Sequence, residues 1–186
     1  MVPLTSLVIP ILLSGVIIFV ASSIFHMLLP FHRLDYRRVP RENDVLDALR
    51  PFAIPPGDYV MPLAESPAAM KSPEFLDKMN KGPVVMMTVM PSGPPAMGGT
   101  FVLWFAYCVV VSLFAAYVAG RALGPGARYL DVFQFAGTVA FIGYSAALWQ
   151  HSIWYKRAWG TTLRSTIDGL IYGMLTGGTF GWLWPR

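Results

Sequence analysis

Residues 168–186 read DGLIYGMLTGGTFGWLWPR and place a glycine at every fourth position, at Gly169, Gly173, Gly177 and Gly181. Residues four apart lie on one face of an α-helix. In water each glycine would weaken such a helix by about 1 kcal/mol relative to alanine. In a lipid bilayer the same stripe is favourable, because small residues let helix backbones approach closely. The stretch therefore predicts a tightly packed membrane helix.

Two other apolar segments carry small residues at a matching spacing, and they are the expected partners of the glycine stripe. These residues are Ser112, Ala116 and Gly120 in one segment and Ala136, Ala140 and Gly143 in the other. We expect packing within the chain. Contact with another membrane subunit or with a second copy of the chain is the alternative.

The apolar character extends over most of the chain. Its 186 residues are 55% hydrophobic and 13% charged, whereas soluble domains carry about 25% charged residues. Asp, Glu, Lys and Arg are absent from 1–32, 82–120, 132–155 and 169–185. Apolar runs of about 18 residues or more predict membrane-spanning helices. We therefore expect an all-α membrane protein with four spans, at 7–29, 99–121, 131–153 and 166–184.

The distribution of basic residues predicts the orientation of the chain. Eleven of the fourteen Lys and Arg residues lie in the loop between the first and second spans or in the loop between the third and fourth. Cytoplasmic loops carry such an excess, so both termini are expected outside a plasma or inner membrane and the long first loop inside. Arginines adjoin the first span and anchor this topology; contact with anionic lipid head groups is the alternative. They are Arg33, Arg37, Arg38 and Arg41.

Residues 32–98 form the only long polar segment, and we expect a small mixed α/β loop domain there. VPRENDVLDALRP, from Val39, predicts a short helix. SPEFLDKMNKGP predicts a second, with Ser72 as its cap and Glu74 one turn before Lys78. Strands at 58–62 and 84–90 are expected to pair.

Three histidines, His26, His32 and His151, are the candidate cofactor ligands, since all lie at the inner ends of predicted spans. Imidazole binds haem iron and other metals. Their spacing matches no metal or haem motif, however, and histidine suits the head-group region, so no cofactor is predicted. Copper is a further alternative, because thioethers bind Cu(I) and methionines gather in the loop. A strand would place Met86 and Met87 on opposite faces.

Asp131 and Asp168 are the only acidic residues in the C-terminal half, and each opens a predicted span. Both are expected to act at helix N-termini, where the helix dipole stabilises a carboxylate. Ser165 and Asp168 have the spacing of a capping box. An interfacial binding or proton-handling role is the alternative, with Asp168 the better candidate.

Several classes of function are not indicated, because the sequence lacks their characteristic motifs. The sequence has no hydrolase or phosphate-binding signature, and its basic residues lie beside membrane ends, which does not indicate nucleic acid. We expect a non-catalytic accessory, assembly or scaffold subunit, acting through helix packing and its loop. A metal- or haem-binding redox subunit is one alternative. A small transporter or channel is another, disfavoured because the spans contain no buried charge.

Four spans with a long structured first loop give a layout that resembles claudin-type proteins. The first loop of that family is extracellular and carries a tryptophan and paired-cysteine pattern that this sequence lacks. The resemblance therefore concerns layout alone and implies no function here.

Overall fold

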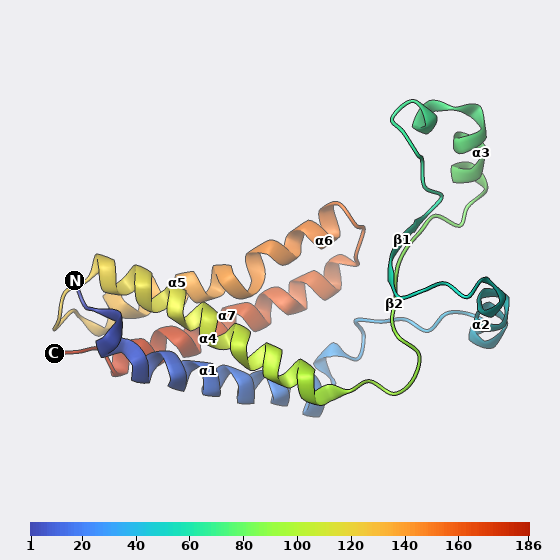
Figure 1. Cartoon of the computed structure of the whole chain (residues 1–186). Helices are drawn as coiled ribbons and strands as arrows, with labels where there is room; N and C mark the ends of the chain where they lie inside the picture. Colours follow the sequence, from blue (N-terminus) through green and yellow to red (C-terminus); the bar gives the residue numbers. More distant parts are fainter. The chain divides into compact units, whose positions relative to one another are not determined.

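The computed structural model describes all residues 1–186 and is mostly helical. The chain divides into two compact units (Figure 1). One comprises Met1–Arg37 and Ala96–Arg186, and we call it the bundle unit. The other is Arg38–Pro95, and we call it the loop unit. Each is described by itself.

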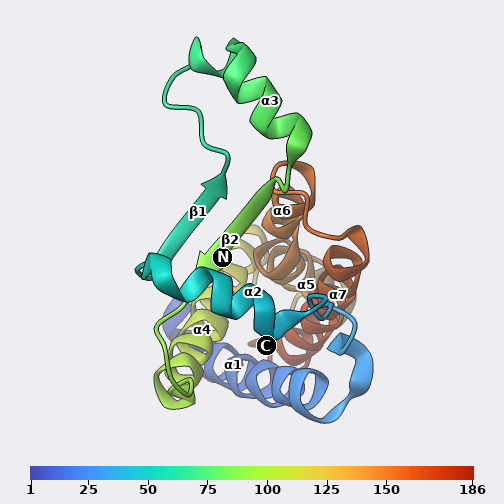
Figure 2. The same ribbon diagram turned by 90° about the vertical axis from the view of Figure 1, so that its right-hand side faces the viewer.

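Four long helices form the bundle unit. They are α1 (Val8–Ser23), α4 (Met97–Ala122), α5 (Tyr129–Ser145) and α7 (Trp159–Trp182), with the short α6 (Trp149–Ile153) preceding α7. The helices pack in a ring, α1 against α4, α4 against α5, α5 against α7 and α7 against α1. Figure 2 views this ring nearly end-on. One end of the bundle therefore holds both chain termini, and the other holds the C-terminal end of α1 and the beginning of α7 (Figure 1).

Three helical segments are long and apolar enough to cross a membrane. They are Leu4–Leu28, Met97–Ala122 and Tyr129–Ile153, which correspond to the first three predicted spans. The fourth predicted span, 166–184, is not confirmed. Its helix α7 begins earlier, at Trp159, and therefore includes Arg164 and Asp168 within the helix. These charges lower the apolar character of its first half.

The glycine stripe of α7 faces α5. A Cβ atom added at Gly173 would lie 2.8 Å from the carbonyl oxygen of Gly137, and one added at Gly177 would lie 2.6 Å from that of Phe133. Such distances are too short for real Cβ contacts, so the backbones can approach this closely only because these positions are glycine. The partner of the stripe belongs to the same chain.

The face of α5 that receives the stripe differs from the one the sequence indicated. The glycines of α7 meet Phe133, Gly137, Phe141 and Ser145, four residues apart. Two of the predicted partner residues face other neighbours: Gly143 faces Val111 of α4, and Gly120 faces Val2 and Leu7. Small residues thus lie at several different helix contacts. Their spacing in the sequence could not show which helix each small residue would contact.

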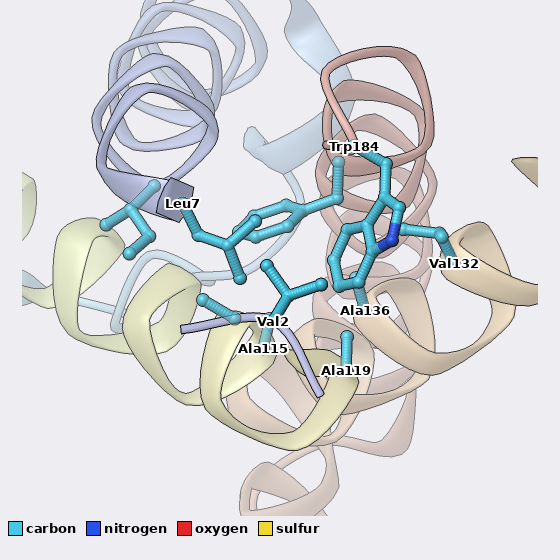
Figure 3. Close-up of a cluster of buried hydrophobic side chains, with 10 residues drawn as sticks. Val2, Leu7, Ala115, Ala119, Val132, Ala136 and Trp184 are labelled. Atoms are coloured by element: carbon cyan, nitrogen blue, oxygen red, sulfur yellow. The ribbon is translucent and has the colours of Figure 1, made fainter. Parts of the chain in front are cut away.

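A hydrophobic cluster closes the end of the bundle that holds the termini. It joins Val2 and Leu7 to Ala115, Val132 and Trp184, from distant parts of the sequence (Figure 3). The backbone N–H of Val2 donates to the carbonyl of Gly120 over 2.8 Å, and the indole of Trp184 donates to the carbonyl of Gly124 over 3.0 Å. The N-terminus is therefore bonded to the last turn of α4, and the C-terminal segment to the loop between α4 and α5.

The loop unit contains two short helices and a two-stranded sheet, as expected. Helix α2 is Glu42–Leu49 and helix α3 is Pro73–Lys81. Strands β1 (Gly57–Met61) and β2 (Val85–Val89) pair antiparallel, with Tyr59 opposite Met87. The hydroxyl of Ser72 caps α3 by accepting from the backbone N–H of Phe75. No residue of this unit is buried, so it has no core of its own.

Candidate metal site at one end of the bundle

The candidate site lies where α1 ends and the chain turns back toward α7. The last turn of this span, Ile24–Leu28, is a π-helix and carries His26. Leu29 then becomes extended, as residues before proline usually do, and Pro30–His32 forms a 3₁₀ turn. This reversal stacks the rings of His26 and His32, with centroids 4.1 Å apart and planes inclined by 28°.

Asp35 fixes the orientation of the His32 ring. Its Oδ2 lies 2.7 Å from Nδ1 of His32, and its Oδ1 accepts from Nε of Arg164 on α7, also over 2.7 Å. The side chains of His32, Asp35 and Arg164 are only 10%, 9% and 20% exposed. A carboxylate at Nδ1 favours a proton on that nitrogen, which leaves the lone pair of neutral imidazole on Nε2.

The second nitrogen of His32 faces Asp168. Nε2 lies 3.0 Å from Oδ2 of Asp168, whose side chain is 6% exposed. The two groups are not aligned for a hydrogen bond, however, and Nε2 has no hydrogen-bond partner elsewhere. A buried polar atom without a partner is costly and calls for an explanation. Here the atom is a ring nitrogen that lies 3.0 Å from a buried carboxylate.

The charged neighbours of Asp35 decide its protonation. Burial raises the pKa of this carboxyl, but the hydrogen bonds from His32 and Arg164 lower it by more, so that its pKa lies below the ordinary value. Asp35 is therefore a carboxylate at neutral pH. It forms a bridge that joins the segment after α1 to helix α7.

The site has the composition of a metal centre with three protein ligands. One ligand atom each from His26, His32 and Asp168 lies within 4.8 Å of the other two. Ligands bound at about 2.0–2.1 Å from one metal are themselves about 3 Å apart, which is the separation of His32 and Asp168. His26 is the exposed member of the three.

The same geometry does not fit haem. The rings of His26 and His32 stack directly on one another, 4.1 Å apart, which leaves no room for a porphyrin between them. His151 lies outside the cluster, with its ring tilted against that of Tyr155 at 5.7 Å. The copper hypothesis gains no support from the loop, because Met86 is exposed and Met87 half-buried on alternate sides of β2.

Asp168 is not a capping residue, contrary to the expectation. Helix α7 begins nine residues earlier, at Trp159, and Ala158 is its N-cap. The hydroxyl of Ser165 donates to the carbonyl of Thr161 and does not form a capping box. The low charge of the segment after Asp168 suggested a helix start there, but the helix extends further toward its N-terminus, to Trp159.

The other polar residues singled out by the sequence lie away from this cluster. Asp131 lies in the first turn of α5, as expected, where it forms an ion pair with Arg128 at 2.8 Å. Arg38 and Arg41 form ion pairs with Glu42 and Asp44, within the loop unit.

Sequence reasoning missed Asp35 and Arg164. A faint signal existed, because His32 and Asp35 are three residues apart, and Arg164 and Asp168 four apart, next to apolar segments. Comparison of the chain with protein-family models, with curated proteins and with solved structures found no match. Fold and site together define a class, a helical bundle with three helices long and apolar enough to cross a membrane and a His and Asp cluster at one end.

Proposed function

We propose that this chain is a membrane metalloprotein that binds one divalent transition metal through His26, His32 and Asp168. Two imidazoles and one carboxylate suit iron(II), manganese(II), cobalt(II) and zinc(II) better than calcium or magnesium. The observation that carries the proposal is the buried Nε2 of His32, which has no hydrogen-bond partner and lies 3.0 Å from the carboxylate of Asp168.

Asp35 supports this proposal as the group behind the ligand. Histidines that bind metals usually donate their other ring N–H to a carboxylate, which fixes the tautomer and makes the ligand more basic. The 2.7 Å contact from His32 to Asp35 supplies that carboxylate. Arg164 in turn neutralises Asp35, so the positive charge of the metal is balanced mainly by Asp168.

Three protein ligands leave at least one coordination position for an exogenous ligand. Structural zinc sites use four protein ligands, whereas catalytic ones use three and keep a position for water or substrate. We therefore propose a site that acts on or senses a bound molecule. This agrees with the metal-binding alternative considered above, with Asp168 in place of His151.

The test is cobalt(II) binding to the purified full-length protein in mild detergent. Cobalt(II) reports its ligands through visible absorption, and elemental analysis gives the stoichiometry. We expect one cobalt per chain in the wild type and in His151→Ala. We expect loss of the absorption band in His32→Ala and Asp168→Asn, with elution from a sizing column unchanged. Equal cobalt binding by all four proteins would refute the site.

A second candidate function is the accessory or scaffold role. The observation that favours it is the apolar surface of the loop unit, where Phe52, Leu63 and Met90 are 73%, 71% and 77% exposed. Exposed apolar patches often mark protein interaction sites. The same purification separates the two candidates: a protein bound in fixed ratio, with no stoichiometric metal uptake, would favour the accessory role.

A further inference from the structure

We propose that the exogenous ligand of this site is a single-chain amphiphile of the membrane, with an anionic oxygen head group, that enters from the bilayer between α1 and α4. The inference rests on the metal site proposed above and names its ligand class. It is carried by a groove that has His26 at one end, by the local helix geometry that places His26 there, and by the charge of the ligand set.

The groove has a volume of about 320 Å³, at the lower end of the range of about 300–1,000 Å³ for small-molecule sites. One wall is formed by the end of α1 and the π-helical turn after it, with Ser23, His26 and Met27, and the α4 wall includes Thr100, Phe101 and Trp104. His26 therefore belongs both to the candidate ligand set and to the wall of the groove. A molecule in the groove can reach the metal without crossing the bundle.

The polar groups along the groove are mostly occupied by protein partners. The indole N–H of Trp104 donates to the hydroxyl of Ser22 over 2.7 Å, and the hydroxyls of Ser22 and Ser23 donate to the carbonyl of Phe19. What remains is largely carbon, from Met27, Phe101 and the face of Trp104. Such a surface favours an alkyl chain, and the imidazole of His26 marks where a polar head would lie.

The position of the groove selects a membrane ligand over a water-soluble one. Both walls belong to segments that can cross a membrane, Leu4–Leu28 and Met97–Ala122. His26 is exposed, whereas His32 and Asp168 are covered by protein. In the proposed site, an exogenous ligand would therefore approach from the His26 side, which is the groove side.

The π-helical turn is an independent observation that points to the same place. Leu29 donates its backbone N–H to the carbonyl of Ile24, a five-residue bond that closes the turn carrying His26. Such turns are rare and occur often at functional sites. Here the wider turn alters the direction of His26, so that it stacks on His32 while remaining at the edge of the groove.

Charge decides the head group. A divalent cation bound by two neutral imidazoles and the carboxylate of Asp168 keeps one net positive charge. In a site of low dielectric an anionic oxygen ligand is favoured over a neutral one. The expected ligand is therefore a carboxylate-type amphiphile, such as a fatty acid, with its chain between α1 and α4.

The experiment compares acetohydroxamate with decanohydroxamate on the cobalt(II)-loaded protein. Both are oxygen-donor metal ligands, and they differ only in the chain. We expect the long probe to change the cobalt spectrum at a concentration at least about tenfold lower than the short one. Thr100→Trp, which fills the groove, should remove this advantage and leave the response to acetohydroxamate unchanged.

Leu103→Trp is the matched control, because this residue is 73% exposed on the same helix and does not line the groove. It should behave as the wild type, and partitioning of the long probe into detergent is the same in all three proteins. If decanohydroxamate keeps the same advantage over acetohydroxamate in Thr100→Trp as in the wild type, the chain does not bind in the groove and the proposal is wrong. Absence of a cobalt site in the wild type would instead overturn the proposed function.

A second measurement uses the wild-type protein and does not depend on folding of a variant. A decanohydroxamate with a photoreactive diazirine at the end of its chain should label peptides from 19–27 and 97–104. Labelling confined to other helices would contradict the proposal, even if the probe binds the metal.

Discussion

At the scale of single residues, the chemistry of this protein depends on His32, which lies between two carboxylates. Asp35 contacts one ring nitrogen and Asp168 the other, at 2.7 and 3.0 Å. The two acids are not equivalent. Asp35 is neutralised by Arg164, whereas Asp168 has no basic partner other than the imidazoles. In the proposed metal site this asymmetry would make Asp35 a positioning group and Asp168 a ligand.

Asp35→Asn should lower the cobalt(II) affinity by about 10–100-fold, the usual effect of removing a group behind a metal ligand. The amide no longer fixes the proton on Nδ1 of His32, so both the ring orientation and the basicity of Nε2 change. Titration followed at the visible band measures this effect. The band itself should keep its shape, because the three ligands are unchanged.

Asp131→Asn is the control for this prediction. Asp131 also forms an ion pair with an arginine three residues away, but at an exposed position at the start of α5. Cobalt affinity should not change in this variant. If Asp35→Asn bound cobalt as tightly as the wild type, Asp35 would be only a structural link between the segment after α1 and α7.

At the scale of secondary-structure elements, the contact between α5 and α7 depends on glycine. A Cβ atom at Gly177 would meet the carbonyl oxygen of Phe133 at 2.6 Å, whereas one at its neighbour Gly178 would meet only the hydroxyl of Tyr129, at 3.5 Å. The first position is closed to any side chain. The second has ordinary room for a methyl group.

Gly177→Ala should therefore destabilise the bundle by about 1–3 kcal/mol, the usual cost of overpacking, while Gly178→Ala should be neutral or slightly stabilising. Both changes add the same methyl group to the same helix one residue apart. Unfolding in mixed micelles with increasing SDS, followed by circular dichroism, measures the difference. Equal stability of the two variants would show that α7 does not pack on α5 through its glycines.

At the scale of the whole molecule, the bundle unit has two different ends. Val2, Leu7 and Trp184 close one end with apolar packing, and His32, Asp35 and Asp168 form the polar cluster of the other. The basic residues that follow α1 are those that predicted a cytoplasmic first loop. The topology predicted from the sequence would place the candidate metal site on the cytoplasmic side and both termini outside.

Reporter fusions test this orientation and the number of spans together. Under the predicted topology, which places the loop unit in the cytoplasm, a fluorescent protein inserted near Lys71 should fold and fluoresce, and alkaline phosphatase fused after Arg186 should be active outside. If both sites instead report the cytoplasm, α7 does not cross the membrane. If a fluorescent protein near Lys71 does not fluoresce and an alkaline phosphatase inserted at the same site is active, the loop unit lies outside and the topology is opposite to the predicted one.

Much of the fold could be predicted from the sequence because the governing signals are local. Long apolar runs predicted the three segments that can cross a membrane, and the proline and valine pattern predicted the paired strands of the loop unit. The beginning of α7 could not be found this way. In the sequence, Arg164 and Asp168 look like charged residues that flank a span. Their partners Asp35 and His32 come from a distant segment, so the sequence does not show that these charges are paired within the folded chain.

The sequence by itself determined that the chain is mostly helical with three segments apolar enough to cross a membrane, that α7 carries a close-packing face, and that His26 and His32 lie near the end of the first of these segments. These properties follow from composition and spacing, which act within a single helix. Only the tertiary structure decided that Asp168 is a buried partner of His32 and that Asp35 and Arg164 complete the cluster. The π-helical turn, the reversal at Pro30 and the packing of α7 bring together groups that are more than 130 residues apart, and no local pattern encodes that distance.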